Sequence, residues 1–217
     1  MSLANLTIIA VVGASASGKS LFAQTIHDEL ITELGEDSIT ILKEDSYYRC
    51  QDHMPMEQRV KTNYDHPKAF EHELLCSHLD HLSQGRPVEV PVYDYKQHTR
   101  NKEQVVVTKP TKILLVEGIL LLTDKNLRDR FDINIYMDTP LDVCLIRRIK
   151  RDLQERGRDL KSVISQYQKT VRPMYYQFIE PSRNHADVVI TKGGKNRTAL
   201  DVVKAKIREL ANQQPVS

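Results

Sequence analysis

One stretch decides the fold of this chain: Gly13-Ala14-Ser15-Ala16-Ser17-Gly18-Lys19-Ser20. It matches the phosphate-binding loop (P-loop) pattern G-x-x-x-x-G-K-[S/T]. Residues 6–12, apolar except for one threonine, precede the loop and are typical of a buried strand. Apolar residues at helical spacing follow over 19–34, and Gly35 stands where such a helix would end. Because backbone N–H groups and a helix N-terminus converge on a phosphate in this arrangement, the stretch predicts binding of a nucleoside triphosphate.

The loop supplies two side chains with separate tasks. Lys19 is expected to reach the outer phosphates, and the Ser20 hydroxyl to ligate Mg²⁺. A turn of small residues without a ligand is the alternative, but it would not require Lys-Ser in register between a strand and a helix. The nucleotide-binding residues expected in the loop are Gly13, Ala14, Ser15, Ala16, Ser17, Gly18, Lys19 and Ser20.

The bulk composition argues against several classes of protein. The 217 residues suffice for a single domain, and 31 Lys+Arg against 29 Asp+Glu give no reason to expect nucleic acid or a membrane as a partner. The three cysteines form no C-x-x-C pair, so neither a disulfide framework nor a zinc ribbon is indicated. Residues 1–12 lack a basic region, and their apolar run is too short to cross a bilayer. We expect one cytoplasmic domain over residues 1–217, with a disordered tail at about 212–217.

Apolar runs alternate with helical patterns along the chain. This alternation predicts an α/β fold of the P-loop kinase type, with a parallel sheet of about five strands flanked by helices. Strands are expected at residues 6–12, 38–42, 112–116, 133–137 and 187–190. Helices are expected at residues 19–34, 71–83, 140–154, 160–177 and 198–211.

Residues 86–109 interrupt the alternation. Residues 87–93 carry valines at every second position, and 105–108 form a second β-rich run. The polar segment 94–103 lies between them, so the pair predicts a small β-hairpin inserted outside the parallel sheet. Such a hairpin could form one wall of an acceptor pocket. The spacing also allows an insertion without a role in the site.

Two acidic residues follow predicted strands. Asp45 comes after the second strand, where side chains point into the ligand crevice of an open α/β sheet. It could accept the proton of an attacking hydroxyl and help to hold Mg²⁺, but its position equally suits a turn or helix cap. Glu117 ends an apolar run and resembles the acid of a Walker B strand, although a surface contact is the alternative. Next to a P-loop we favour the metal role, with Ser20, Asp45 and Glu117 as ligands.

Residues 147–158 hold six basic and two acidic residues in a nearly neutral chain. We expect a helix there with Arg148 and Arg151 on one face, followed by the flexible joint Arg156-Gly157-Arg158. Its other face, expected to pack on the core, carries Val143, Ile146, Ile149 and Leu153. Beside a P-loop this predicts a lid over about 147–160, whose guanidinium groups bind phosphate oxygens on closure. A solvated, ion-paired helix is the alternative, and the spacing of Arg151 and Glu155 suits it.

A P-loop alone is compatible with a GTPase switch, a motor ATPase or a small-molecule kinase. The switch class requires D-x-x-G and N-K-x-D elements, and neither occurs in this sequence. A motor would be expected to carry further signature blocks on a longer chain. An arginine lid on a short chain instead suits phosphoryl transfer to a small acceptor, because closure keeps water from the triphosphate. We therefore expect a kinase.

Beyond these motifs, the chain resembles the uridine kinases (uridine–cytidine kinases) of the phosphoribulokinase/uridine kinase family, in their bacterial form. The resemblance runs nearly end to end and is far more specific than the P-loop. The matching blocks are G-A-S-A-S-G-K-S at 13–20, E-D-S-Y-Y at 44–48, N-Y-D-H-P at 63–67, P-V-Y-D-Y at 91–95, H-T-R at 98–100, V-E-G-I-L at 116–120, E-R-G-R-D at 155–159, Q-Y-Q-K-T-V-R-P-M at 166–174 and G-G-K-N-R at 193–197.

The resemblance implies an activity and a set of site residues. Asp45 would be the catalytic base for the ribose 5′-hydroxyl of uridine or cytidine, with ATP or GTP as donor and Mg²⁺ as cofactor. Lys19, Arg151 and Arg156 would act with it in catalysis, and Arg158 would join Arg151 and Arg156 on the triphosphate side. The nucleoside pocket would be lined by Tyr48, Asp65, Tyr93, His98, Arg148 and Gln166. The products would be UMP or CMP in pyrimidine salvage. A homotetramer inhibited by CTP and UTP is also implied.

One departure and one rival remain at this point. Lys192 stands where the family commonly has an arginine before its paired glycines, which leaves the choice between ATP and GTP open because lysine cannot stack as arginine does. A sugar-phosphate kinase of the phosphoribulokinase type would need basic residues for the phosphate of its acceptor. Candidates are present at Arg49, Arg59, Lys61, Lys68 and Arg100, so only the residue-by-residue match favours a nucleoside.

Overall fold

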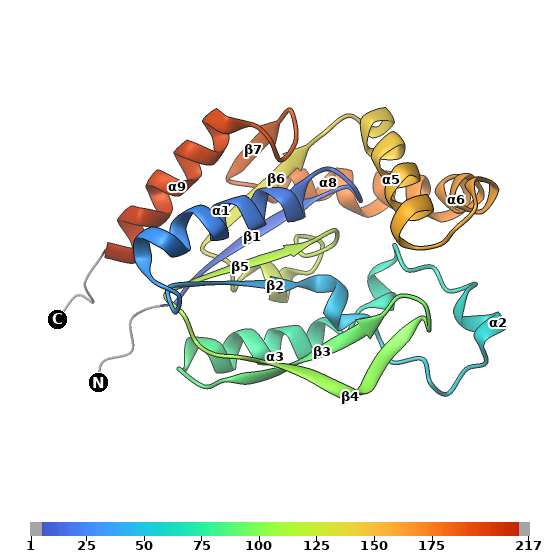
Figure 1. The fold of residues 1–217 in the computed structure, drawn as a ribbon, viewed down its shortest axis with the longest axis horizontal. Coiled ribbons are helices and arrows are strands. Elements are labelled where there is room, and N and C mark those ends of the chain that lie inside the picture. Colours follow the sequence, from blue (N-terminus) through green and yellow to red (C-terminus); the bar gives the residue numbers. More distant parts are fainter. Residues whose placement is uncertain (1–5, 213–217) are drawn as a thin grey trace.

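The computed structural model describes residues 6–212. Five parallel strands form the central sheet in the order β2-β5-β1-β6-β7, which confirms the expected α/β fold (Figure 1). The strands are β1 (Thr7–Gly13), β2 (Ile39–Lys43), β5 (Ile113–Gly118), β6 (Ile133–Asp138) and β7 (Val188–Thr191). All the residues of the expected tail except Asn212 lie outside the described part of the chain, and Asn212 is the last residue of α9.

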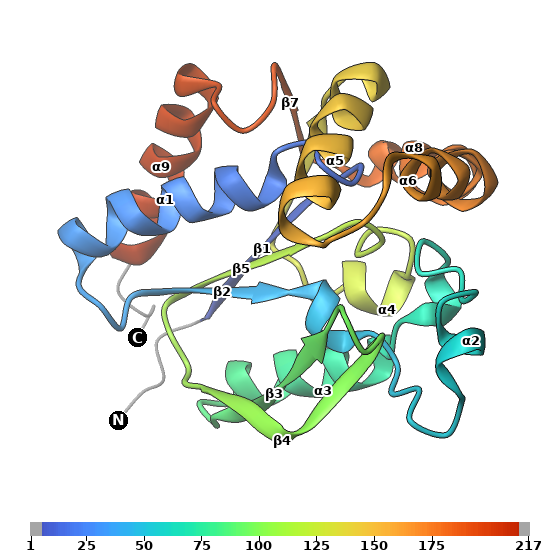
Figure 2. The same ribbon diagram turned by 45° about the vertical axis from the view of Figure 1, so that its right-hand side comes forward.

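Helices cover both faces of the sheet. The longer ones are α1 (Lys19–Leu34), α3 (His72–Ser83), α5 (Leu141–Glu155), α6 (Leu160–Gln166) and α9 (Arg197–Asn212). The short ones are α2 (Met56–Arg59), α4 (Lys125–Arg128), α7 (Arg172–Met174) and α8 (Glu180–Ser182), with 3₁₀ turns η1 (Glu44–Tyr47), η2 (Pro67–Ala69) and η5 (Arg183–His185). Helices α1 and α9 lie on one face of the sheet, and α3 on the other (Figures 1 and 2). Within residues 6–212, no helix has the length and apolar character that crossing a membrane requires.

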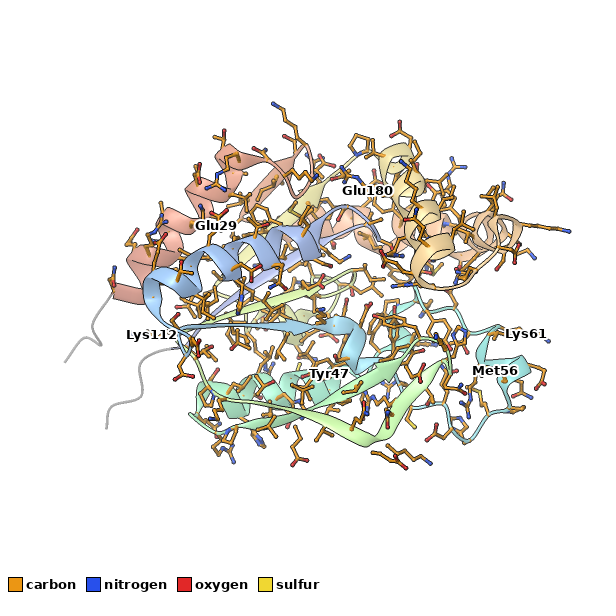
Figure 3. The ribbon with its side chains drawn as sticks, viewed as in Figure 1. Glu29, Tyr47, Met56, Lys61, Lys112 and Glu180 are labelled. Carbon is orange, nitrogen blue, oxygen red and sulfur yellow. The ribbon has the colours of Figure 1, made fainter. Side chains whose placement is uncertain are left out.

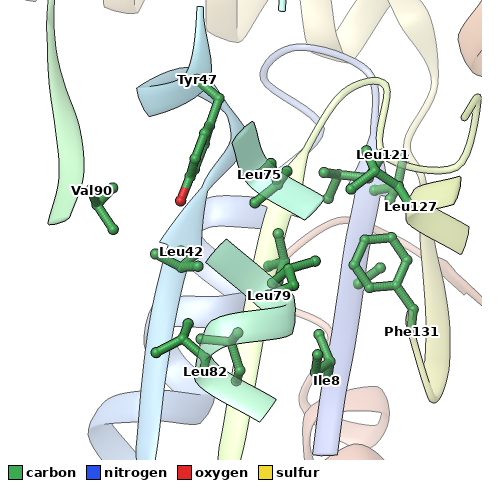
Figure 4. Close-up of a cluster of buried hydrophobic side chains, with 14 of the residues drawn as sticks. Ile8, Leu42, Tyr47, Leu75, Leu79, Leu82, Val90, Leu121, Leu127 and Phe131 are labelled. Atoms are coloured by element: carbon green, nitrogen blue, oxygen red, sulfur yellow. The ribbon is translucent and has the colours of Figure 1, made fainter. Parts of the chain in front are cut away.

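The sheet is buried on both faces because its strands are apolar at successive positions. In β1, Ile8 packs toward the core beneath α3, whereas Ile9 packs toward the core beneath α1 and α9. Figure 4 shows the first of these cores, in which Leu75, Leu79 and Leu82 of α3 face Leu42 of β2. This two-sided burial leaves the carboxyl edge of the sheet as the place for polar side chains.

The hairpin is present, but the expected strand boundaries were wrong. Its strands are β3 (Val88–Asp94) and β4 (Thr99–Thr108), so most of the polar segment 94–103 belongs to the two-stranded sheet rather than to a loop. The pairing register changes between Pro91, opposite Val105, and Val92, opposite Asn101. Proline has no N–H to donate to the ladder, which accounts for an irregularity at this position.

The helix expected at 160–177 is not a single α-helix. Two π-helical stretches, η3 (Tyr167–Val171) and η4 (Tyr175–Ile179), alternate with α7 and α8, and helical winding continues to Ser182. Pro173 and Pro181 fall within α7 and α8. Each removes one donor from the α-helical ladder, and wider turns are a known response to such an interruption.

The expected core face of α5 was also wrong. The buried row of this helix is Cys144, Arg148 and Asp152, whereas Ile146 and Leu153 are 55% and 40% exposed. The residues of the buried row are spaced four apart and therefore share one face. This face is polar because it borders the P-loop, as the contact between Arg148 and Ser15 described below shows.

Candidate active site

The P-loop joins β1 to α1 and is held by close backbone packing. Gly18 has φ +101°, and a side chain there would place its Cβ only 2.6 Å from the backbone nitrogen of Gly194. Only glycine is compatible with both conditions. The carbonyl of Gly18 accepts the first hydrogen bond of α1, from Phe22 N at 2.9 Å. The free N–H groups at the start of α1 therefore face the loop, where a phosphate can be bound.

The three expected metal ligands come from three neighbouring elements: Ser20 from α1, Asp45 from η1 after β2, and Glu117 from β5. Glu117 at the end of β5 is level with Val11 of β1 on one side and Lys43 of β2 on the other. The Ser20 hydroxyl donates a hydrogen bond of 2.8 Å to Glu117 Oε2. Burial raises the pKa of the Glu117 carboxyl above its ordinary value, and the charge of Lys19 opposes this shift. The pairing of β2 with β5 places both acids at the carboxyl edge of the sheet, and the hydrogen bond to Glu117 brings the Ser20 hydroxyl there too.

These donors suit Mg²⁺. A hydroxyl and two carboxylates are oxygen ligands, which Mg²⁺ prefers. In the described part of the chain, no group of three or more His, Cys, Asp or Glu side chains is gathered into a metal cage. Mg²⁺ usually takes one or two carboxylates together with substrate phosphates and water, so the set fits an ion shared with a nucleotide.

Glu44, which the sequence did not single out, ties this edge together. It is fully buried, and its Oε2 accepts hydrogen bonds from the N–H groups of Ile119 (2.7 Å) and Leu120 (3.0 Å). Its Oε1 lies 2.8 Å from His72 Nε2. Glu44 thus holds two segments together: the turn that contains Asp45, and the loop that follows Glu117. The only signal in the sequence was the acidic pair Glu44-Asp45.

Asp45 is half-buried and contacts the hairpin. The Tyr95 hydroxyl donates a hydrogen bond of 2.6 Å to Asp45 Oδ2. Burial, followed by the charge of Asp45, raises the pKa of Tyr95 above its ordinary value. The guanidinium carbon of Arg156 lies 4.6 Å from the centroid of the Tyr95 ring. Fifty positions separate the two hydrogen-bonded residues, so no local pattern could reveal this contact.

The aromatic residues expected in the acceptor pocket form one cluster. Tyr48 stacks on Phe70 at 4.2 Å and meets Tyr93 at 4.9 Å, both between ring centroids. His98 stacks on Tyr64 at 5.5 Å. Met56 of α2 and the nearby Lys61 lie at the opposite end of the molecule from Lys112, which precedes β5 (Figure 3).

Two of the polar residues expected in the pocket are buried beside the P-loop. Arg148 donates from Nη1 to Ser15 Oγ and from Nη2 to Gln166 Oε1, both at 3.0 Å. Burial raises the pKa of Asp65, and the charge of Arg148 opposes that shift. A narrow pocket with a cavity volume of about 10 Å³ lies beside them. Its lining residues are Ala14, Ser15, Asp65, Leu141, Cys144, Leu145, Arg148, Tyr167, Val171, Arg172, Tyr175 and Ile179. Asp65 and Arg148 of the expected acceptor side and Ala14 and Ser15 of the P-loop therefore border one space.

The arginines expected in the lid converge on one acid. Asp152 is fully buried and lies within 4.0 Å of four guanidinium groups, those of Arg148, Arg151, Arg156 and Arg158. Arg151 forms an ion pair with Asp152 at 2.9 Å, whereas the ion-paired alternative had paired it with Glu155. Asp152 was not among the predicted residues, although its spacing of four from two of the arginines was a visible signal.

Arg158 was expected on the triphosphate side. Its guanidinium donates to Gln166 Oε1 and to Ser162 Oγ, the latter at 2.8 Å. Gln166 is one of the residues expected to contact the nucleoside, so Arg158 lies at the border between the two expected subsites.

Comparison with known proteins decides the family. The model of the Phosphoribulokinase / Uridine kinase family matches residues 8–199. This chain belongs to that family. The family resemblance seen in the sequence is confirmed, and the chain is a kinase. A uridine kinase of Shewanella piezotolerans is 56% identical over 210 residues, which are 97% of this chain and 99% of the relative. A uridine kinase of Aeromonas hydrophila is 59% identical over 203 residues, 94% of each chain.

Solved structures of the family share the fold. A phosphoribulokinase from Rhodobacter spheroides superposes with a TM-score of 0.63 at 14% identity, covering 86% of this chain and 70% of its own. A protein from Bacillus stearothermophilus, described as a possible uridine kinase, has a TM-score of 0.53 at 22% identity, covering 88% and 91%. At these identities the likeness concerns the fold alone.

Proposed function

We propose that this kinase transfers the γ-phosphoryl group of ATP or GTP to the 5′-hydroxyl of uridine or cytidine, giving UMP or CMP in pyrimidine salvage. The observation that carries the proposal is the convergence of Ser20, Glu117 and Asp45 at the P-loop, with Asp45 in contact with the hairpin. Relatives named uridine kinase are 56% and 59% identical to this chain over nearly its whole length, and they support the choice of acceptor.

The donor would be held by the P-loop. Its backbone N–H groups and Lys19 would bind the phosphates, and Arg151 and Arg156 would stabilise the charge that develops on the transferring group. Mg²⁺, held by Ser20, Asp45 and Glu117, would neutralise phosphate charge when bound. Lys192 is exposed and has φ +66° at the turn before Gly193, on the side expected for the donor base.

The acceptor would lie across the pocket from the donor. Tyr48, Tyr93 and His98 would contact the base, and Asp65, Arg148 and Gln166 the ribose hydroxyls. Asp45 would take the proton of the 5′-hydroxyl as that oxygen bonds to the γ-phosphorus, while the bond to the leaving diphosphate breaks. The protein would thereby orient both reactants and exclude water.

The sugar-phosphate alternative is less favoured by the contacts of the basic residues. Arg49 pairs with Glu73 at 3.1 Å, and Arg100 with Glu71 at 2.7 Å. Arg59 donates to the carbonyl of Met54 at 2.8 Å. Three of the five candidate phosphate ligands are therefore already engaged by the protein.

We also propose a cytoplasmic homotetramer that is inhibited by CTP and UTP. Consecutive valines of β4, Val105, Val106 and Val107, are 51–61% exposed. Grouped apolar side chains on a surface favour contact with another protein chain. Light scattering would give the assembly, and inhibition by CTP would be measured against uridine concentration.

The deciding experiment is steady-state release of nucleoside diphosphate from ATP and from GTP with Mg²⁺, with and without uridine. We expect strong uridine-dependent release with UMP formed in equal amount. Comparing the release rates with the two donors would rank ATP against GTP. If uridine does not stimulate release, cytidine is tested next, and release that neither nucleoside stimulates would reject the proposal and direct the search to ribulose 5-phosphate.

A further inference from the structure

The contact between Tyr95 and Asp45 places an alcohol on the candidate base. The phenolic O–H donates to Asp45 Oδ2 at 2.6 Å, a distance typical of strong hydrogen bonds from hydroxyl groups to carboxylates. The proposed function puts the 5′-hydroxyl of the nucleoside in the same relation to Asp45. The Tyr95 hydroxyl therefore binds the candidate base, Asp45, in the way that an acceptor hydroxyl would.

Two neighbouring groups hold the Tyr95 ring in this place. Arg156 of the lid segment lies over one face, 4.6 Å from the centroid. The ring of Tyr93 meets it edge-on at 5.3 Å between centroids and an interplanar angle of 83°. The ring is nevertheless 43% exposed, so it can turn toward solvent without first displacing a packed core.

A catalytic base without a partner beside a bound triphosphate could promote hydrolysis of that triphosphate. A water molecule on Asp45 could give its proton to the carboxylate while its oxygen bonds to the γ-phosphorus and the bond to the diphosphate breaks. The products would be nucleoside diphosphate and inorganic phosphate, without any nucleotide made from the acceptor. Kinases commonly avoid this side reaction by excluding water from the site.

We infer that Tyr95 is a positioning residue that keeps water off Asp45 until the acceptor hydroxyl replaces its own. The inference rests on the proposed function. Arrival of the acceptor breaks the contact with Asp45 and moves the ring away from Arg156. The same event thus frees the base and releases an arginine that can then bind phosphate. The Tyr95 side chain thus couples phosphoryl transfer to the binding of the acceptor.

The test is Tyr95→Phe, which removes the hydroxyl and keeps the ring that packs against Arg156 and Tyr93. Tyr176→Phe is the matched control, because Tyr176 is also exposed and carries an arginine, Arg172, 5.8 Å from its ring centroid. Release of nucleoside diphosphate from Mg²⁺–ATP is measured without nucleoside and over a range of uridine concentrations. UMP is measured in the same samples.

We expect Tyr95→Phe to raise release without nucleoside about tenfold, the scale of one hydrogen bond to a charged group. At low uridine the ratio of UMP to diphosphate falls below that of the wild type, and saturating uridine restores it because the acceptor then covers Asp45. Tyr176→Phe behaves as wild type.

Nucleoside-independent release within twofold of wild type overturns the inference, as does an equal rise in both variants. A ratio that saturating uridine leaves low would indicate a general loosening of the site and also overturns it. These outcomes are read against a wild type that uridine stimulates. A wild type that neither uridine nor cytidine stimulates instead refutes the proposed function.

Discussion

Gly118→Ala would test how the two acids of the candidate metal site, Glu117 and Asp45, are held in place relative to each other. Gly118 follows Glu117, and a Cβ placed on it would lie 2.3 Å from Glu44 Oε2 and 2.5 Å from Glu44 Cβ. Since Glu44 Cβ is attached directly to the backbone, rotation of the side chain cannot relieve the overlap. The turn that carries Glu44 and Asp45 must move away from the loop after β5.

The size of the effect follows from the contacts that this movement breaks. Glu44 Oε2 would lose its hydrogen bonds from the N–H groups of Ile119 and Leu120. Hydrogen bonds to charged groups contribute about 1.5–3 kcal/mol each, so the free energy of unfolding should fall by about 3–6 kcal/mol. Turnover should fall about 10²-fold, because displacing a catalytic group by an ångström costs about that much.

Urea denaturation followed by circular dichroism would measure the stability, and uridine-dependent diphosphate release the turnover. Gly35→Ala is the control. Gly35 has φ +94°, and a methyl group at this position would have no other atom within 4 Å, so that variant carries backbone strain without a clash. The reasoning is refuted if Gly118→Ala loses no more stability than Gly35→Ala and keeps its turnover.

Three further substitutions address the base, the lid and a surface ion pair. Asp45→Asn should lower kcat at least about 10²-fold while calorimetry finds nucleotide affinity retained; near-normal turnover would exclude the base. Asp152→Asn should lower kcat about tenfold, because four arginines lose their shared counter-ion, whereas Asp142→Asn on the same helix should not. The hydrogen bond from Arg197 lowers the pKa of Glu29 from 4.5 to about 2, so its stabilisation is complete above the unfolded pKa and is lost as pH falls from 4.5 toward 2. Denaturation at several pH values should show that the free energy of unfolding falls less steeply with decreasing pH in Glu29→Gln than in the wild type. The same steepness in both proteins would contradict this.

Local patterns predicted most of the fold. The P-loop and the alternation of apolar runs with helical patterns predicted five parallel strands, each within two residues of its observed ends. These signals work because a strand buried on both faces must be apolar throughout. They failed at Pro91, where the ladder changes register, and along 167–179, where helical winding takes a π form.

The error on α5 has a specific physical cause. Apolar periodicity assigns the apolar face of a helix to the core, and Ile146 and Leu153 define such a face. This helix instead buries Arg148 and Asp152, because their charges satisfy one another and the P-loop. A rule based on hydrophobicity cannot identify a buried face that is stabilised by ion pairs.

The sequence by itself determined the family, the phosphate loop and the chemical types present at the site, because motif spacing and residue chemistry are local properties. Only the tertiary structure decided which groups meet. The hydroxyl of Tyr95 reaches Asp45 across fifty positions, and Glu44 joins two loops that follow different strands. Such contacts depend on strand order and helix placement, which bring together residues that no sequence window contains.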